Sequence, residues 1–443
     1  MLPSIVLVIV DGMGPTTMEA ARIVEYGNVN SSVINYFEAV RPVSTQNIDD
    51  NLTDSAAAGT AISTGQKTTN GRLGMDKNGV YLQNLIEYMR EQHPEYVTGI
   101  ISKIYSGHAT PASFLVHKAD RSDLKHVYQS MVDYSKADLI VSAGYKYVKP
   151  FKQQFEAQKY NFISTTAFKN NANIISETQL PLMVITDDSD YMPYFMDEPE
   201  STLIRVVRQS IDRLNKTGPF FLMVECSLVD FGGHEQNGSK LVGDMIEADL
   251  LLRELLEMDL KTVLVADHET GGVTITGDLK GLDDLPLPGG TDAHLTRKKR
   301  IEQLGLKFTS THHSNSFITF GAHGFGPVNW VQTTSDVRRF INLYLDGVEP
   351  MPYVACTKNE AENIFKNRFY FVPGEDSKKK PNKAGIIIGT VMGFMGVLGI
   401  AAFVYVFIKR QKVQSAKLQN SVLQMSSFPQ AEQSIQTTDK LGV

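Results

Sequence analysis

Residues 4–14 have the sequence SIVLVIVDGMG, in which an unbroken aliphatic run ends at Val10 and is followed by Asp11. A continuous run of this kind is typical of a strand buried on both faces, as the strands of parallel sheets are. Ligands of open α/β sheets bind outside the carboxyl ends of the strands. We therefore predict a central strand here, with Asp11 in a functional position, rather than a cleavable signal peptide.

Two further apolar runs, at 220–226 and 262–266, also end beside carboxylates and imidazoles. An acidic side chain in a buried strand is costly unless it is paired or bound to a metal ion. Mixed carboxylate and imidazole ligands suit Zn²⁺, whereas all-oxygen sets suit Mg²⁺. We therefore expect a metal site where these strands end. The side chains concerned are Glu225, Asp230, His234, Asp267 and His268.

Residues 50–61, DNLTDSAAAGTA, place Asp54 and Ser55 ahead of very small residues that predict the first turns of a helix. Backbone N–H groups at a helix start have no partner within the helix, and the helix dipole is positive there. A serine in this position can bind an anion and loses its proton more readily. An Ala-rich helix with an ordinary N-cap has the same pattern, so this stretch alone leaves both interpretations open.

Two more segments carry candidate residues. In SGHATPASF, residues 106–114, Thr110 is placed to cap a helix that begins with Pro111, and Arg121 is expected near the end of that helix. In THHSN, residues 311–315, two adjacent histidines precede another apolar run. The charged, loop-rich segment 278–310 is expected to form a variable cap over the site.

Composition and patterning place the chain in the α/β class. The 443 residues are 42% hydrophobic, and helix-like segments at 81–92, 203–214 and 242–256 alternate with apolar strands. The formal net charge of −6 gives no reason to expect nucleic-acid binding. The two cysteines, Cys226 and Cys356, are expected to be free thiols.

The C-terminal part has a different character. Residues 384–408 contain no charged side chain, and as a helix these 25 residues would be about 37 Å long, enough to cross a bilayer. A Lys-rich linker, 374–383, precedes them, and the polar tail 409–443 is expected to be disordered. Lysines on both sides leave the membrane orientation open. The catalytic domain is expected to be residues 1–373.

Six motifs occur in the order and spacing of the alkaline phosphatase family, which this chain resembles from residue 3 to residue 344. They are Asp11, TDSAAAGTA at 53–61, HATPASF at 108–114 with Arg121, VECSLVDFGGH at 224–234, ADHETGG at 266–272, and His313. The resemblance implies a large, mostly parallel sheet between two helix layers. It also implies an enzyme that faces outside the cytosol and forms a homodimer.

The resemblance implies a role for individual residues. Ser55, beside Asp54, corresponds to the nucleophile that accepts phosphate, and Arg121 to the arginine that binds phosphate oxygens. It further implies two Zn²⁺ and one Mg²⁺ per chain. The ligands would be Asp230, His234 and His313 for the first zinc, Asp11, Asp267, His268 and Ser55 for the second, and Asp11, Thr110 and Glu225 for magnesium.

Three positions are less certain matches. His108 and Phe231 stand where family members vary, and we interpret both as neighbours of the metal and phosphate sites. His313 is preferred to His312 because counting back from Gly324, at the end of the following strand, gives the family's ligand position. An error of one residue would exchange the two histidines.

The expected function is therefore that of a membrane-anchored, metal-dependent phosphatase that hydrolyses phosphate monoesters through a phosphoserine. A related phosphodiesterase, nucleotide pyrophosphatase or sulfatase is the alternative enzyme. Diesterases of this superfamily typically lack the third metal and the matching arginine, whereas Thr110, Glu225 and Arg121 are present here. A non-catalytic surface protein on the same scaffold is the other alternative, and the filled ligand positions argue against it.

Overall fold

The computed structural model describes residues 2–27 and 32–347, which belong to one compact unit within Met1–Phe369. A nine-stranded sheet has the strand order β2-β13-β8-β1-β7-β3-β4-β6-β5. Strands β8 to β5 of this order run parallel, and β13 is antiparallel to both β8 and β2. The bounds are β1 Ile5–Val10, β2 Ala39–Val43, β3 Val97–Tyr105, β4 Leu139–Ala143, β5 Asn161–Ile163, β6 Leu182–Ile185, β7 Phe220–Cys226, β8 Lys261–Val265 and β13 Ile318–His323.

The run that opens the sequence forms the central strand β1, as predicted. All six of its residues are completely buried, and it lies between β7 and β8. Ile9 pairs with Glu225 on one side and with Val265 on the other. This register sets the carboxyl ends of the three strands level, so the residues that follow them meet at one edge of the sheet.

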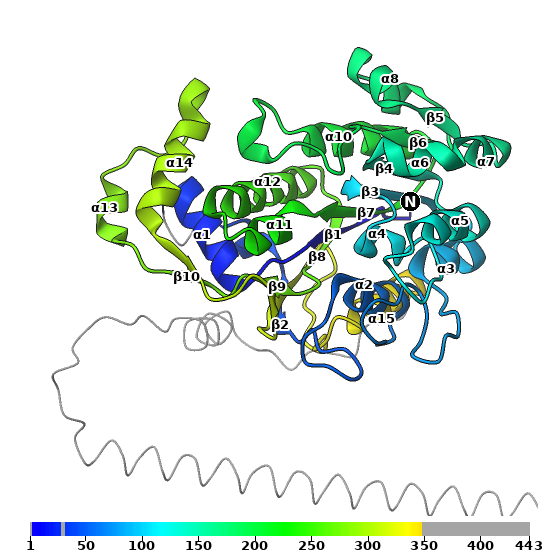
Figure 1. The fold of residues 1–443 in the computed structure, drawn as a ribbon, viewed down its shortest axis with the longest axis horizontal. Helices are drawn as coiled ribbons and strands as arrows, with labels where there is room; N and C mark the ends of the chain where they lie inside the picture. Colours follow the sequence, from blue (N-terminus) through cyan, green and yellow to red (C-terminus); the bar gives the residue numbers. More distant parts are fainter. Residues whose placement is uncertain (1, 28–31, 348–443) are drawn as a thin grey trace, which may run out of the picture. The chain divides into compact units, whose positions relative to one another are not determined.

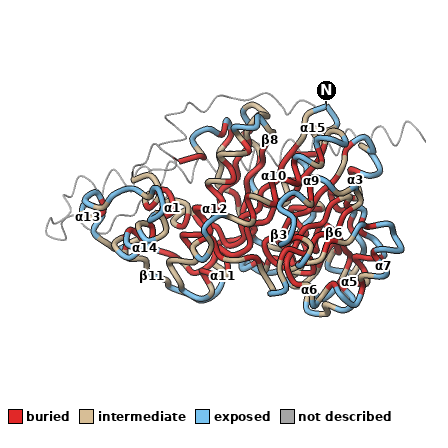
Figure 2. Tube along the Cα trace, turned by 90° about the horizontal axis from the view of Figure 1, so that it is seen from above, coloured by how far each residue is buried: buried red, intermediate tan, exposed pale blue. Residues whose placement is uncertain are grey.

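Helices cover both faces of the sheet, which confirms the predicted layered α/β fold (Figure 1). Helices α1, α10 and α12 lie on one face, and α2, α3 and α15 on the other (Figure 1). Figure 2 shows that the buried residues are concentrated in the strands and on the inner sides of these helices. The bounds are α1 Pro15–Tyr26, α2 Ser55–Thr64, α3 Leu85–Gln92, α10 Thr202–Asn215, α12 Gly238–Glu257 and α15 Asp336–Leu345.

The remaining elements connect these layers or pack at their edges. The helices are α4 Ala109–Ala112, α5 Leu124–Tyr134, α6 Tyr145–Val148, α7 Lys152–Ala157, α8 Thr165–Asn170, α9 Ile174–Glu177, α11 Leu228–His234, α13 Leu279–Asp283 and α14 Ala293–Leu304. The 3₁₀ turns are η2 Val33–Tyr36, η3 Lys149–Phe151, η4 Phe195–Asp197 and η5 Gly290–Asp292. Two small antiparallel sheets have two strands each. One pairs β9 Glu269–Thr270 with β12 His313–Ser314, and the other pairs β10 Val273–Ile275 with β11 Leu306–Phe308.

Two local predictions differ from the structure. The helix expected after Thr110 is only the single turn α4, and His108 rather than Thr110 precedes it as the N-cap residue. Beyond α4 the chain pairs with an earlier segment, where Lys118 exchanges two backbone hydrogen bonds with Leu73, each 2.8 Å long. Arg121 consequently lies in a loop.

The expected cap at 278–310 is the second difference. Helix α14 of this segment packs against α1 and α12, and it lies well away from α2 (Figure 1). Arg297 forms a bidentate ion pair with Glu25 of α1, with both N–O distances at 2.7 Å. Arg300 donates to the carbonyl oxygens of Ile23 and Val24, at the end of α1. These contacts hold the segment against α1 instead of over the site.

Several predictions fall on residues outside the described ranges. They are the span 384–408, the linker 374–383, the tail 409–443 and the free thiol of Cys356. Within residues 2–27 and 32–347, no helix has both the length and the apolar character needed to cross a membrane. Cys226, in β7, is a buried free thiol as expected.

Candidate active site

The site lies at the carboxyl edge of the central strands. Asp11 follows β1 and Asp267 follows β8, and the parallel register sets them level. The Asp267 carboxylate accepts a hydrogen bond from the Gly12 backbone N–H at 3.3 Å. Gly12 has a φ of +78°, and a Cβ there would lie 2.6 Å from the Cα of Asp230. A side chain at this position would therefore push α11 away from β1.

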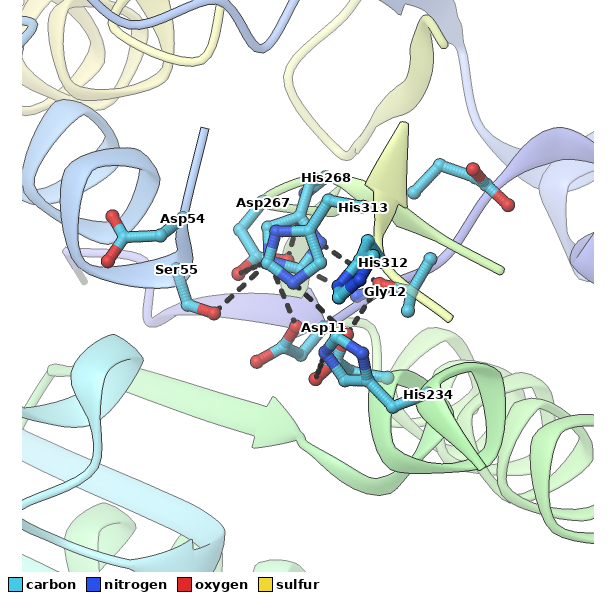
Figure 3. Close-up of polar contacts among 12 residues, drawn as sticks. Asp11, Gly12, Asp54, Ser55, His234, Asp267, His268, His312 and His313 are labelled. Carbon is cyan, nitrogen blue, oxygen red and sulfur yellow. Dashed lines mark hydrogen bonds and ion pairs between the residues drawn. The ribbon is translucent and has the colours of Figure 1, made fainter. Parts of the chain in front are cut away.

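Helix α11 and strand β12 bring the remaining predicted ligands to this edge. Asp230 and His234 are four residues apart on α11, so they share one face of the helix. Strand β12 pairs with β9 so that His313 lies opposite Thr270, two residues after His268. Segments that are far apart in the sequence thus converge on one centre, with side chains pointing toward one another in Figure 3.

Ser55 is the first residue of α2, as the sequence predicted for a helix start. Asp54 is the N-cap residue, and its carboxylate accepts a hydrogen bond from the Ala57 N–H at 2.8 Å. Ser55 itself is almost completely buried, and its Oγ lies 3.1 Å from Nε2 of His268 (Figure 3). The hydroxyl therefore faces both the positive end of a helix and an imidazole nitrogen.

Asp11, Asp267 and His268 form the first of three groups that could hold a metal ion. Nε2 of His268 lies 3.5 Å from Oδ1 of Asp11 and 3.2 Å from Oδ2 of Asp267. Both carboxylate oxygens of Asp11 and Oδ2 of Asp267 are buried without a hydrogen-bond partner. Buried acceptors without partners are rare in folded proteins, and three of them directed at one point fit a bound cation.

The charges in this group support the same conclusion. Burial, and then repulsion from Asp267, raises the pKa of Asp11 well above its ordinary value. Burial, and then repulsion from Asp230, raises the pKa of Asp267 to about 8. Neighbouring buried carboxylates resist ionisation together because their charges repel. A divalent cation between them would remove that penalty.

Asp230, His234 and His313 form the second group. Nδ1 of His234 donates to the Thr311 carbonyl at 2.6 Å, and Nδ1 of His313 donates to the Thr53 carbonyl at 2.8 Å. With a proton held on Nδ1 by these carbonyl oxygens, Nε2 of each ring faces Asp230, at 3.3 Å from His234 and 3.7 Å from His313. Without a metal ion, the hydrogen bond to Asp230 raises the pKa of His234 to about 9, so its Nε2 also carries a proton that a bound zinc would displace. Such backbone contacts fix the tautomer that a zinc-ligating histidine needs.

Thr270 connects the first and second groups, and no sequence pattern marked it as a site residue. Its hydroxyl donates to Oδ1 of Asp230 and accepts from Nδ1 of His268 at 3.2 Å. The hydroxyl therefore sets the His268 tautomer as well, leaving Nε2 free to face Ser55. A threonine after an Asp-His pair carries no periodic signal, so only the three-dimensional contacts identify it.

Asp11, His108 and Glu225 form the third group. Oε1 of Glu225, Oγ1 of Thr110 and Nδ1 of His108 are all buried without a partner. Ser102 donates to the other Glu225 oxygen, a contact that sequence reasoning also missed. Burial raises the pKa of Glu225 to about 7. The predicted magnesium ligands are thus together, and His108 lies beside them.

Arg121 lies at the open side of the site. It donates to Oδ2 of Asp54 and to Nε2 of His108, both at 3.2 Å. Burial, reinforced by the Arg121 charge, lowers the pKa of His108 to about 3, so this imidazole is neutral. The guanidinium is thereby held beside the start of α2, where Ser55 lies.

The two adjacent histidines of 311–315 have different surroundings. His313 belongs to the second ligand group, whereas His312 is exposed and belongs to none of the groups found among the described residues. The backbone N–H of His312 donates to the Ser310 hydroxyl at 2.9 Å. The pairing of β12 with β9 therefore favours His313 as the ligand.

Comparison with known proteins gives consistent results. The family model "Alkaline phosphatase" matches residues 3–287. Alkaline phosphatase 4 of Bacillus subtilis (strain 168) is 29% identical over 294 residues, covering 61% of this chain and 62% of that protein. The tissue-nonspecific isozyme of alkaline phosphatase from Homo sapiens is 24% identical over 345 residues, covering 62% of this chain and 65% of that protein.

Solved structures show the same fold. Alkaline phosphatase from the Antarctic bacterium TAB5 has a TM-score of 0.65 at 22% identity, covering 78% of this chain and 98% of that one. The Thermus thermophilus alkaline phosphatase has a TM-score of 0.64 at 19% identity, covering 83% and 97%. The chain spans a little under two thirds of the two curated relatives described above. Because the family model matches more than half of its length, this chain belongs to the alkaline phosphatase family.

Proposed function

We propose that this chain is a metal-dependent phosphomonoesterase in which Ser55 accepts the phosphoryl group before water removes it. One observation carries the proposal: the Ser55 hydroxyl lies 3.1 Å from Nε2 of His268, within a group of buried ligand atoms that lack partners. Family membership supports the same reaction class.

The residues of the chain have distinct parts in this reaction. Asp54 holds the start of α2 in place, so that the N–H groups there face the phosphate along with the Ser55 hydroxyl. Arg121 carries two guanidinium donors beside that helix start, which suits two phosphate oxygens at once. Burial of the ligand groups excludes water and strengthens every electrostatic interaction with the phosphate.

The proposed cofactors are two Zn²⁺ and one Mg²⁺. The zinc ions would be held by Asp230, His234 and His313, and by Asp11, Asp267, His268 and Ser55. Bound zinc would lower the pKa of the serine hydroxyl and neutralise charge on the leaving oxygen. The magnesium ion would be held by Asp11, Thr110 and Glu225. The unpartnered oxygens of these three residues support this last set.

A comparison of two substrates tests the function. The full chain, supplied with zinc and magnesium, should hydrolyse p-nitrophenyl phosphate with a kcat/KM at least a hundredfold above that for bis-p-nitrophenyl phosphate. Arg121 favours the monoester, because a monoester presents one more anionic oxygen for the guanidinium to bind. Thr110 favours it as well, because Thr110 belongs to the proposed magnesium site and related diesterases typically lack the third metal. Preference for the diester would instead support the phosphodiesterase alternative, and hydrolysis of neither would support a non-catalytic surface protein.

We also propose that residues 384–408 anchor the enzyme in a membrane, with the catalytic domain outside the cytosol. The uncharged 25-residue run supports the anchor, whereas the side of the membrane is implied by the family resemblance alone. The full chain should co-sediment with membranes after a high-salt wash, whereas a chain ending at residue 375 should be released and remain active. Retention of the shortened chain in the membrane fraction would contradict this anchor. The homodimer stays a prediction from the family resemblance.

A further inference from the structure

A row of aromatic rings lies beside the candidate phosphate site. His108 makes edge contacts with Tyr105 and Phe231, at ring-centroid distances of 5.5 and 6.2 Å. Tyr147 lies 4.4 Å from Tyr105, and Tyr191 lies 5.9 Å from Phe231. All five residues are only partly buried. We call these five residues the ring row.

The ring row is continuous with the residues that would bind phosphate. His108, at its centre, accepts a hydrogen bond from Arg121 at 3.2 Å. Phe231 directly follows Asp230 on α11 and is three residues before His234, so its ring lies beside the exposed ligand group. A group attached to phosphate at this site would therefore have aromatic surface within reach.

The burial of the ligand groups indicates the side on which the leaving group lies. The side chains of Asp11, Asp267 and His268, next to Ser55, are fully buried. By contrast, the His234 side chain is 37% exposed. In an in-line displacement the leaving oxygen lies opposite the attacking one. With Ser55 attacking from the buried side, the alcohol extends toward the exposed His234, and Phe231 of the ring row lies one helical turn before His234 on α11.

The chemistry of the ring row favours a flat, apolar group. Aromatic pairs prefer offset or edge contacts. Three of the four ring pairs in the row meet edge to face, and each of the five residues keeps part of its surface accessible to a further ring. Two nearby cations already have carboxylate partners. Lys146, whose ammonium lies 4.8 Å from the centroid of the Tyr147 ring, pairs with Asp190 at 2.7 Å, and Lys240 pairs with Glu235 at 2.6 Å. A negatively charged leaving group would find no free partner in these two lysines.

We propose that the ring row is a leaving-group subsite that gives the enzyme a preference for phosphate monoesters of aromatic alcohols. The inference rests on the proposed phosphomonoesterase function and deepens it by naming the substrate class. The subsite adds binding energy through ring contacts and takes no part in breaking the phosphorus–oxygen bond. Its effect should therefore appear as selectivity between substrates of equal intrinsic reactivity.

Benzyl phosphate and cyclohexylmethyl phosphate provide that comparison, because both release a primary alcohol and differ mainly in the flatness of the ring. The full metal-loaded chain should have a kcat/KM for the benzyl ester about tenfold above that for the cyclohexylmethyl ester. Tyr191→Leu and Phe231→Leu should each reduce this ratio about fivefold. Tyr191→Phe should retain the ratio, because it retains the ring. Tyr134→Leu, which removes a partly exposed ring on α5 outside the row, is the matched control.

The results of this experiment distinguish a failure of the subsite proposal from a failure of the proposed phosphomonoesterase function. Efficient hydrolysis of both esters with a ratio near one would overturn the subsite and leave the phosphomonoesterase intact. An unchanged ratio in both leucine variants, or an equal fall in the Tyr134→Leu control, would also overturn it. Hydrolysis of neither ester would overturn the proposed function, and the subsite with it. A fall confined to the ring-row leucine variants, with Tyr191→Phe unaffected, supports the inference.

Discussion

Thr270→Val should weaken metal binding although Thr270 is not itself a predicted ligand. The hydroxyl donates to Asp230 and accepts from the Nδ1–H of His268, and all three side chains are buried. Valine has nearly the same shape, so the substitution removes the two hydrogen bonds without opening a cavity. Asp230 loses one donor, and Nδ1 of His268 is left unsatisfied.

The size of the effect follows from these two lost contacts. A buried polar group left unsatisfied costs about 1–3 kcal/mol, and about 2 kcal/mol corresponds to roughly thirtyfold in an equilibrium constant. Loss of such outer contacts typically weakens metal affinity by about 10- to 100-fold. We therefore expect the zinc dissociation constant to rise by about thirtyfold, with a matching loss of activity at limiting zinc that excess zinc partly restores.

Competition with a chromogenic zinc chelator measures this constant directly. Thr274→Val is the matched control, because Thr274 is exposed on β10 and its hydroxyl contacts only the Lys307 carbonyl at 3.4 Å. That control should bind zinc as the unaltered chain does. If Thr270→Val bound zinc within twofold of the unaltered chain, the assignment of Thr270 as the residue that fixes the His268 tautomer would be refuted.

Three further predictions concern the same site. His313→Ala should lose one zinc per chain by elemental analysis, whereas His312→Ala should keep both; the reverse result would mean that the histidine register is off by one. Arg121→Ala should weaken inhibition by inorganic phosphate and raise KM more than it lowers kcat, and a loss confined to kcat would contradict its role. In the metal-free protein, folded Asp267 keeps its proton up to about pH 8, whereas an unfolded aspartate releases it near 3.8. The unfolding free energy of the chelated protein should therefore fall as pH rises between these values. Asp267→Asn should flatten that dependence in thermal melts, and an unaltered slope would count against the burial argument.

The sequence predicted the framework of the site because its signals are local. The β1 run is uniformly aliphatic, and an acidic residue within a buried strand, as Glu225 is, is rare unless it is paired. Ser55 was identified because Asp54 and the small residues after it mark a helix start, which the structure has at that residue. The family resemblance then predicted that these separate residues belong to one site.

Other features depend on contacts between distant segments and leave no local signal. Thr270 and Ser102 are ordinary hydroxyl residues in strands, and only the fold brings them to Asp230 and Glu225. Lys118, in the segment expected to be helical, instead pairs with Leu73, 45 residues earlier in the chain. Arg300 turns the segment after 278 toward α1 by binding carbonyl oxygens there, which no charge pattern predicts.

Trapping of a phosphoenzyme tests the central claim most directly. The metal-loaded chain, mixed with a labelled phosphate monoester and quenched in acid, should carry one phosphoryl group, which peptide mass spectrometry should locate on Ser55. Ser55→Ala should carry no label and lose turnover by several orders of magnitude while still binding both zinc ions within tenfold. Label on another residue, or full turnover by the Ser55→Ala variant, would contradict the account.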